Sequence, residues 1–457
     1  MMNSLLSGKM VGGIKQIKTE SLCPTCLKKT DAVVIEEDDG MIIRITCPIH
    51  GTVDNPHLFH DPEIYTSMRA LMAARDDKWV PDAAFHDVIN RCNMNCPQCF
   101  IPKVQSPETK PTIGQLESEA KSHKGSIIYL FGGEPTMQED LTEIIELFSK
   151  RGYETSFFTN GLKMADIEYA EKISRTKPMV VLSIDTQDQK QGLEIYGADV
   201  LHEKIFALDN IISLNLPVFL NVVLRKGLNE NQIQKFIELL KSKDGKVRGI
   251  SFSGYWNPSG TKQDDIVPVK EVIEKIKQEI DCSLEDFIDC TLFGLYFSQL
   301  IRKITDSGGR RISACYLRLY LVHYHSRLTP LNRYINLPKL NEKLRQIYDN
   351  FQGTFFSRHK AVIATAIAFS MSIKKTSFIG IIIKNIRYCT PIAFSNRHPA
   401  TMLIPRTSSI VITRYFDLSN VDLEFIPYCS LGAIEEGGVM PFCLREIMRS
   451  AKRSREG

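Results

Sequence analysis

The sequence predicts an α/β protein with a core of six strand–helix repeats, a small metal-binding segment before it and an α+β extension after it. Short apolar segments alternate with amphipathic ones, about every thirty residues, from residue 85 to residue 254. This rhythm stops near residue 260, and closely spaced cysteines precede it. The 457 residues exceed one ordinary core. We therefore expect domains at 1–75, 82–260 and 261–457.

The six strand candidates are short and rich in Val, Ile and Phe, as strands buried on both faces should be. Apolar residues recur at helical spacing in the segments between them. Such βαβ units with right-handed crossovers form a parallel sheet or an incomplete barrel, and a doubly wound sheet is the alternative. The expected strands are 85–90, 126–131, 155–159, 179–184, 218–224 and 249–253, and the expected helices are 139–151, 167–174, 203–214 and 230–241.

The extension is expected to begin with helices and to end in strands. Helical spacing covers 269–280, 286–304 and 340–351, whereas 361–416 is rich in Ile, Thr and Ser and suggests strands. The apolar segment 361–383 is interrupted by two lysines, which favours buried core over a lipid-facing surface. The basic end, 449–455, reads as a solvated, frayed terminus.

Composition excludes several classes of protein. A formal net charge of +4 is small for this length and gives no argument for nucleic acid. No secretory signal and no run of eighteen apolar residues are visible, so we expect a cytoplasmic protein without a transmembrane segment. In that compartment, the twelve cysteines indicate metal rather than disulfides.

Three cysteines, Cys92, Cys96 and Cys99, follow the first core strand directly. Their spacing lets one loop turn three thiolates toward one point. Three thiolates can hold three irons of a cubane cluster, which leaves the fourth iron open to a small molecule. A zinc knuckle is the alternative, but zinc usually takes four protein ligands and no fourth lies nearby.

Polar residues end the next strands, where active sites of parallel α/β folds gather. The run Gly132-Gly133-Glu134-Pro135 would bring its backbone close to a ligand. A carboxylate at the end of the fourth strand could bind ribose hydroxyls, and an arginine after the fifth could pair with a ligand carboxylate. Each residue could instead be a cap or a turn residue. The further candidates are Thr159, Asn160, Ser183, Asp185, Asn221 and Arg225.

The amino-terminal segment predicts a second metal site. Cys23 and Cys26 form a CxxC motif, and Cys47 and His50 form a CxxH motif after a hairpin-like stretch. Two such knuckles give a tetrahedral site for zinc or a single iron. A disulfide or free thiols are the alternative.

Six cysteines lie scattered after the core, and scattered cysteines are most often buried as small apolar residues. Several could instead hold an auxiliary iron–sulfur cluster. Cys429 and Cys443 are the best candidates because each lies beside a turn.

The three-cysteine loop and the Gly-Gly-Glu-Pro run together resemble the radical S-adenosylmethionine (SAM) superfamily, across residues 85–254. The resemblance implies a partial (βα)6 TIM-type barrel. It also implies a [4Fe–4S] cluster whose open iron binds SAM, and a 5′-deoxyadenosyl radical that abstracts hydrogen from an unactivated carbon. The residue before the third cysteine is often aromatic in that superfamily and is Gln98 here. The flanking motifs resemble archaeal tetraether lipid synthases and relatives proposed as pterin methylases, but a cysteine-rich stretch of that group is missing at residues 76–82.

These resemblances predict an enzyme that functionalises a small or lipid-like substrate by carbon–carbon coupling or methylation. A reductant such as ferredoxin or flavodoxin would serve it, and peripheral membrane contact is compatible with it. One alternative is a radical SAM enzyme that modifies a peptide or protein. A remote one is a zinc-binding interaction protein.

Overall fold

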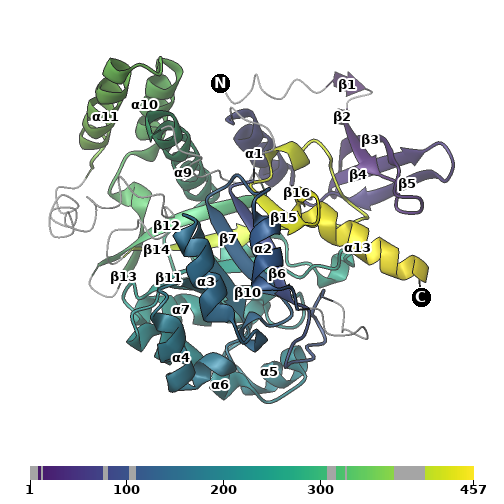
Figure 1. Ribbon diagram of the computed structural model, residues 1–457. Coiled ribbons are helices and arrows are strands. Elements are labelled where there is room, and N and C mark those ends of the chain that lie inside the picture. Colours follow the sequence, from purple (N-terminus) through teal and green to yellow (C-terminus); the bar gives the residue numbers. More distant parts are fainter. Residues whose placement is uncertain are drawn as a thin grey trace.

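The computed structural model describes residues 9–11, 14–75, 81–101, 110–305, 315–324, 327–374 and 407–456. Two sheets organise this part of the chain (Figure 1). The amino-terminal strands form a five-stranded sheet. The later strands form an eleven-stranded sheet in the order β13-β12-β14-β11-β10-β9-β8-β7-β6-β15-β16.

The centre of the large sheet is the predicted six-stranded parallel core. Neighbouring strands from β6 to β11 pair in parallel, which confirms the α/β prediction. The observed ends differ from the expected ones by at most two residues. The strands are β6 (Ala83–Ile89), β7 (Ile127–Gly132), β8 (Glu154–Thr159), β9 (Met179–Ser183), β10 (Val218–Leu224) and β11 (Val247–Gly254).

Amphipathic helices connect these strands, because one apolar stripe of each packs on the sheet. The spacing predicted all of these helices except the first (113–120) and the fourth (189–196). A capping box at Thr112 and Gln115 begins the first of them. The helices are α2 (Ile113–Ala120), α3 (Leu141–Lys150), α4 (Ile167–Ser174), α5 (Gln189–Tyr196), α6 (Leu201–Ser213), α7 (Ile233–Ser242) and α8 (Val269–Lys277).

Residues after 260 extend both edges of this sheet, which the sequence did not predict. On one edge β14 (Thr407–Thr413) pairs in parallel with β11, and β12 (Tyr316–Tyr324) and β13 (Arg327–Pro330) follow it. On the other edge β15 (Leu431–Glu435) pairs in parallel with β6, and β16 (Gly438–Pro441) follows. The division of the chain near residue 260 therefore stays a prediction.

The amino-terminal sheet contains the predicted hairpin. Its strands are β1 (Lys9–Val11), β2 (Ile14–Leu22), β3 (Lys29–Glu37), β4 (Gly40–Cys47) and β5 (Gly51–Pro56), all antiparallel. Helix α1 (Pro62–Ala73) follows and is capped by Asp61. The buried Thr19 donates a hydrogen bond to Asp422, which joins this sheet to the carboxy-terminal part of the chain.

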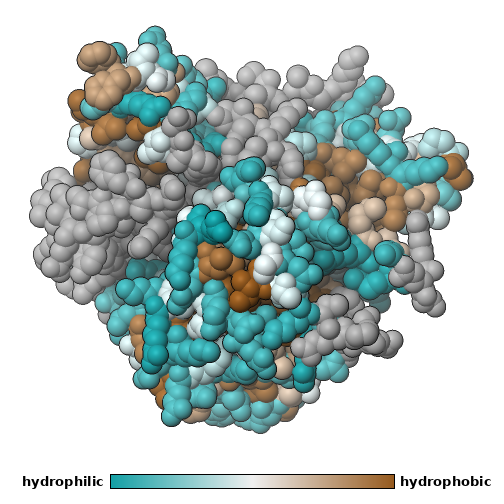
Figure 2. Space-filling view, viewed as in Figure 1, coloured by the Kyte–Doolittle hydropathy of each residue, from teal (hydrophilic) through white to brown (hydrophobic). Residues whose placement is uncertain are grey.

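Beyond the core, α9 (Leu284–Thr305), α10 (Leu337–Asp349) and α11 (Phe355–Ser370) form a helical arm (Figure 1). The predictions of strands over 361–416 and of buried core over 361–383 are wrong for α11, whereas β14 does lie within the predicted strand segment. The α11 segment is a helix, and Val362, Ile363 and Ile367 are more than half exposed, which Figure 2 shows as an apolar surface. Residues 375–406 of the predicted segment lie outside the described residues.

The carboxy terminus is also ordered, contrary to the predicted frayed end. Helix α13 (Phe442–Glu456) begins at β16 and turns Arg445 and Arg449 toward Asp87 of β6. Arg449 also pairs with Glu435 at 2.7 Å. These ion pairs hold the helix on the edge of the barrel.

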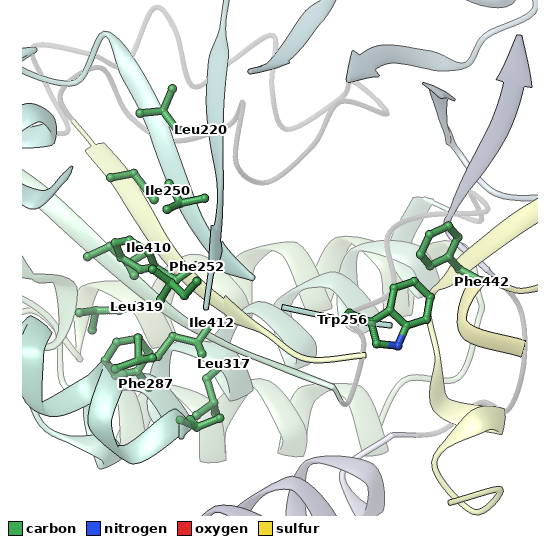
Figure 3. Packing of buried hydrophobic residues seen from close by; sticks show 14 of the residues in the cluster. Leu220, Ile250, Phe252, Trp256, Phe287, Leu317, Leu319, Ile410, Ile412 and Phe442 are labelled. Carbon is green, nitrogen blue, oxygen red and sulfur yellow. The ribbon is translucent and has the colours of Figure 1, made fainter. Parts of the chain in front are cut away.

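The hydrophobic core lies between the sheet and its helices. Figure 3 shows residues of β10, β11, β12 and β14 packed together with Phe287 of α9, and Trp256 and Phe442 beside one another. Among the described residues, none of the helices combines the length and the apolar character that a membrane span requires.

Candidate functional site

A cavity of about 220 Å³ opens at the carboxyl ends of the core strands and contains the predicted cluster loop. Eleven of the thirteen core residues that the sequence singled out line it, since successive parallel strands end at one edge of the sheet. They are Cys92, Cys96, Cys99, Gly132, Gly133, Glu134, Thr159, Asn160, Ser183, Asp185 and Asn221.

The three loop cysteines suit a cluster better than a single ion. They line one cavity, but at least two of their sulfur atoms lie more than 4.8 Å apart. The ligand atoms of a single-ion site would lie closer together than this. Burial is the main cause that raises the pKa of Cys96 to about 11. Iron would hold these thiols as thiolates. The donor set and its spacing therefore fit a [4Fe–4S] cluster.

The two glycines at the end of β7, Gly132 and Gly133, bring the cluster loop and the next turn together. A Cβ atom at Gly132 would collide with the carbonyl of Ile89, and one at Gly133 with the carbonyl of Arg91. The Gly133 amide donates to Ile89 O at 2.7 Å, and the Glu134 amide donates to Arg91 O at 2.8 Å. The glycines thus permit close contact with the backbone that leads into the cluster loop.

The Glu134 carboxylate fixes the turn internally. Its Oε1 accepts hydrogen bonds from the hydroxyls of Thr136 at 2.6 Å and Thr159 at 2.7 Å. Its Oε2 accepts a hydrogen bond from the backbone amide of Asn160 at 2.7 Å. Pro135 begins a short 3-10 helix and does not line the cavity. The turn is therefore tied to the end of β8.

A buried lysine that the sequence analysis missed lies behind the loop. Lys204 of α6 is 1% exposed, and its Nζ donates to Asn160 O and Ser183 O at 2.9 Å each. It also lies 4.3 Å from the Tyr196 ring centroid. In the sequence it looks like one more surface charge of an amphipathic helix, so no local signal identified it.

Asp185 offers a carboxylate to the cavity. Its Oδ1 accepts from the Val223 amide at 2.7 Å, and its Oδ2 has one long bond of 3.4 Å from Gln98. Burial raises the pKa of Asp185 to about 6. Arg225 differs from expectation: it does not line the cavity, and its Nε donates to Asp265 at 2.9 Å. Strand β10 ends at Leu224, so at Arg225 the chain has already turned away from the cavity and toward the segment that contains Asp265.

Aromatic rings form the cavity wall on the side of the carboxy-terminal segments. The Trp256 ring lies 5.0 Å from Phe100, 5.2 Å from Tyr415 and 5.7 Å from Phe442. Trp256 Nε1 donates to a backbone carbonyl, so the ring is held in place. Tyr415 and Phe442 come from outside the repeats, and for this reason the sequence analysis did not connect them with the site.

The four predicted amino-terminal ligands lie close enough together to bind a single tetrahedral metal ion. The ligand atoms of Cys23, Cys26, Cys47 and His50 all lie within 4.8 Å of one another. Cys26 and Cys47 sulfurs are 4.0 Å apart, close to the ~3.8 Å expected between thiolates on one zinc ion. The donors suit zinc or a single iron.

Cys429 and Cys443 do not reach this first cavity. They line a second cavity on the amino side of the barrel interior, together with Cys315. Of the other described late cysteines, Cys282 and Cys290 are buried elsewhere.

Comparison with known proteins identifies the class. Residues 87–240 match the Radical SAM superfamily model, and residues 17–56 match the HMPTM N-terminal zinc ribbon domain. Residues 87–240 therefore form a radical SAM domain, and this class of enzyme domain implies a [4Fe–4S] cluster and SAM as cofactors.

Two relatives are similar over different lengths. The 7,8-dihydro-6-hydroxymethylpterin dimethyltransferase of Methanocaldococcus jannaschii is 26% identical over 470 residues, which cover 93% of this chain and 92% of that protein. The GTP 3',8-cyclase of Campylobacter jejuni subsp. doylei is 30% identical over 208 residues, 42% of this chain and 64% of that protein. Among solved structures, Streptococcus suis SuiB bound to S-adenosylmethionine matches 46% of this chain and 50% of that chain, with 17% identity and a TM-score of 0.38.

Proposed function

We propose that this enzyme uses SAM to functionalise, and most specifically to methylate, a carbon of a small fused nitrogen heterocycle of the pterin class. The observation that carries the proposal is the aromatic wall of Phe100, Trp256, Tyr415 and Phe442 in the same cavity as the cluster cysteines. Flat heterocycles stack on such rings, and stacking on an aromatic side chain contributes about 1–3 kcal/mol of binding free energy per nucleobase.

The two relatives support the same substrate class. One is named for a dihydropterin and the other for GTP, and both molecules contain two fused nitrogen rings. The first relative is similar along nearly the whole chain, including the amino-terminal ribbon. This favours methylation of a pterin over cyclisation of a nucleotide.

The opposite side of the cavity is suited to the cofactor. When bound, the reduced cluster supplies the electron that cleaves the sulfonium bond of SAM. Cys92, Cys96 and Cys99 would hold three irons. The backbone at Gly132 and Gly133 and the hydroxyl and amide side chains at the ends of β8 and β9 line the same cavity and would contact the bound cofactor.

Asp185 is the group we assign to the ribose. Its Oδ2 faces the cavity with one long hydrogen bond, so two ribose hydroxyls can donate to it. Glu134 and Lys204 are positioning residues, because their polar atoms bind the strand ends that carry Thr159, Asn160 and Ser183. The apolar wall excludes water from the carbon that reacts.

The test is anaerobic turnover with 7,8-dihydro-6-hydroxymethylpterin, SAM carrying a labelled methyl group and a strong reductant. We expect 5′-deoxyadenosine and methionine from the SAM molecule that is reductively cleaved. A second SAM molecule, which donates its methyl group, should leave S-adenosylhomocysteine and a pterin heavier by one or two labelled methyl groups. The Cys96→Ala variant should form none of these products. Trp256→Ala should raise the KM for the pterin and leave the Kd for SAM unchanged.

The outcomes separate the cofactor chemistry from the substrate. Formation of 5′-deoxyadenosine without a methylated pterin would overturn the substrate assignment, and the lipid-like and peptide substrates expected from the sequence would then be assayed in the same way. Absence of 5′-deoxyadenosine with every substrate would overturn the assignment of the site.

A further inference from the structure

We propose that the amino-terminal ribbon, residues 17–56, positions the substrate side of the first cavity through a buried contact with residues 415–425. We call residues 415–425 the bridge segment, because they connect the cavity wall at Tyr415 with the ribbon. Asp422 and His57 are the positioning residues of this contact. The inference deepens the proposed function and rests on it, because that function assigns the aromatic wall to the substrate.

The first end of the bridge segment forms part of the cavity wall. Tyr415 lines the cavity, and its ring lies 5.2 Å from the ring of Trp256. The next residue, Phe416, accepts a hydrogen bond from Trp256 Nε1 at 3.0 Å through its backbone carbonyl. Trp256 is buried, so this bond also satisfies the polar atom of its side chain. The positions of two rings of the wall therefore depend on the backbone of residues 415 and 416.

The other end of the bridge segment binds an edge of the ribbon. Strand β1 pairs with β2 over residues 14–16, so the later residues of β2 lie beyond this pairing. Such a sheet edge offers backbone donors and acceptors to another segment. The Leu423 amide donates to Glu20 O at 2.9 Å, and the buried Ser21 hydroxyl donates to Val421 O at 2.7 Å. The ribbon is thus docked on the later chain by hydrogen bonds at its edge.

Asp422 lies at the buried centre of this contact. Its Oδ1 accepts hydrogen bonds from the Thr19 hydroxyl and from the Glu424 amide, and its Oδ2 lies 3.4 Å from His57 Nε2. The Phe59 amide donates to His57 Nδ1 at 3.1 Å, which indicates that the proton of the neutral ring is on Nε2 and faces Asp422. A buried carboxylate is stable only where donors hold it. Asp422 therefore keeps the ribbon edge and His57 in fixed positions.

An aromatic cluster connects this centre with the cavity wall. The His57 ring lies 6.1 Å from Phe416 and 5.9 Å from Phe425. The Phe59 ring lies 6.1 Å from Phe416 and 5.4 Å from Phe425. Buried rings at these distances cannot move independently, because protein interiors are close-packed. Phe416 is therefore held by its ring from the ribbon side, and its carbonyl holds Trp256 on the cavity side.

The alternative is that the contact contributes only to the stability of the fold. The two roles can be separated, because the bridge segment contacts the aromatic wall, whereas the cluster loop and the glycine turn follow β6 and β7. Loss of a purely stabilising contact would weaken the binding of substrate and SAM alike. Loss of a positioning contact should weaken the binding of the substrate alone.

A protein with a single tryptophan reports on the wall. The chain contains two tryptophans, so Trp79→Phe leaves Trp256 as the one fluorescent indole. In this full-length, anaerobically reconstituted background, Asp422→Asn keeps the side-chain shape but replaces a carboxylate oxygen that accepts hydrogen bonds by an amide group. We expect the emission of Trp256 to shift to longer wavelength and its quenching by acrylamide to increase, because the indole is no longer held in one position.

Two further variants frame this result. Asp54→Asn is the matched control, because it also removes a carboxylate of the ribbon, but the ion pair of Asp54 with Arg44 is exposed and contributes little. Its Trp256 emission should equal that of the parent protein. Thr19→Val removes one hydrogen bond to Asp422 with almost no change in volume, and it should shift the emission in the same direction by a smaller amount. This variant also serves if Asp422→Asn does not fold.

Binding and turnover measurements then separate positioning from stability. Asp422→Asn should raise the KM for the pterin about tenfold, within the range that the stacking of one ring contributes. The kcat, the Kd for SAM and the formation of 5′-deoxyadenosine without pterin should stay at the values of the parent protein.

Equal emission and quenching in Asp422→Asn and Asp54→Asn would overturn the proposal, as would a Kd for SAM that rises as much as the KM. The fluorescence and the SAM titration need no substrate. If the pterin is not methylated, these two measurements still decide whether the ribbon positions the wall, and the substrate assignment of the proposed function fails by itself.

Discussion

Replacing Gly133 by alanine tests how closely the turn after β7 must approach the cluster loop. Gly133 has an ordinary backbone conformation, so alanine adds only steric contact. The new Cβ would overlap the carbonyl of Arg91 and lie 2.9 Å from the Asn90 carbonyl carbon. These neighbours are backbone atoms, which cannot rotate away as a flexible side chain would.

Overpacking of this kind costs about 1–3 kcal/mol, and a rigid backbone neighbour places Gly133→Ala at the upper end. The strain can be relieved by moving the loop that carries Cys92, since Arg91 precedes that cysteine directly. Because 1.4 kcal/mol is a factor of ten in an equilibrium constant, about 3 kcal/mol corresponds to about a hundredfold weaker SAM binding.

Isothermal titration of SAM into anaerobically reconstituted protein measures this effect, with sulfide content as a check on cluster loading. Gly114→Ala is the control, because its Cβ would meet nothing within 4 Å and its position in α2 favours alanine. We expect Gly114→Ala to bind SAM like the wild type. A Gly133→Ala protein with full sulfide content and wild-type SAM affinity would refute the reasoning.

Three further substitutions have measurable consequences. Lys204→Met leaves two buried carbonyls without their donor and should lower the free energy of unfolding by about 2–5 kcal/mol in urea titrations. SAM affinity should fall as the pH drops below about 6, because burial raises the pKa of Asp185 to about 6. The protonated carboxyl accepts hydrogen bonds from ribose hydroxyls poorly. Asp185→Asn should bind SAM more weakly, with an affinity that no longer changes with pH in this range. Although burial opposes ionisation, Arg445 and Arg449 lower the pKa of Asp87. Asp87→Asn should therefore cost about 3 kcal/mol at neutral pH. The difference should begin to shrink as the pH falls through about 4, the pKa of an unfolded Asp, and should vanish only below the lower pKa of folded Asp87.

The core could be predicted because its signals are local. The strand predicted at 218–224 matches the observed β10 residue for residue, because its run of Val, Phe and Leu, interrupted only by Asn221, is typical of a central parallel strand. The cysteine spacing and the Gly-Gly-Glu-Pro run carry their chemistry within a few residues. The hairpin of the ribbon follows in the same way from its Asp-Gly turn.

The helix α11 shows where local reasoning fails. Its β-branched residues suggested strands, yet Thr354 caps a helix whose apolar side chains remain largely exposed in the described structure. Propensity is a weak guide where no burial pattern accompanies it.

The sequence by itself determined the class of chemistry, because a thiolate cage and the turn that packs on it are made by neighbours in the chain. Only the tertiary structure decided what surrounds that chemistry. Lys204 became a buried donor, Tyr415 and Phe442 became a cavity wall, and Cys315 joined Cys429 and Cys443. The physical reason is that these contacts join residues far apart in the chain, and no periodicity or spacing records which distant segments the closing of a sheet will bring together.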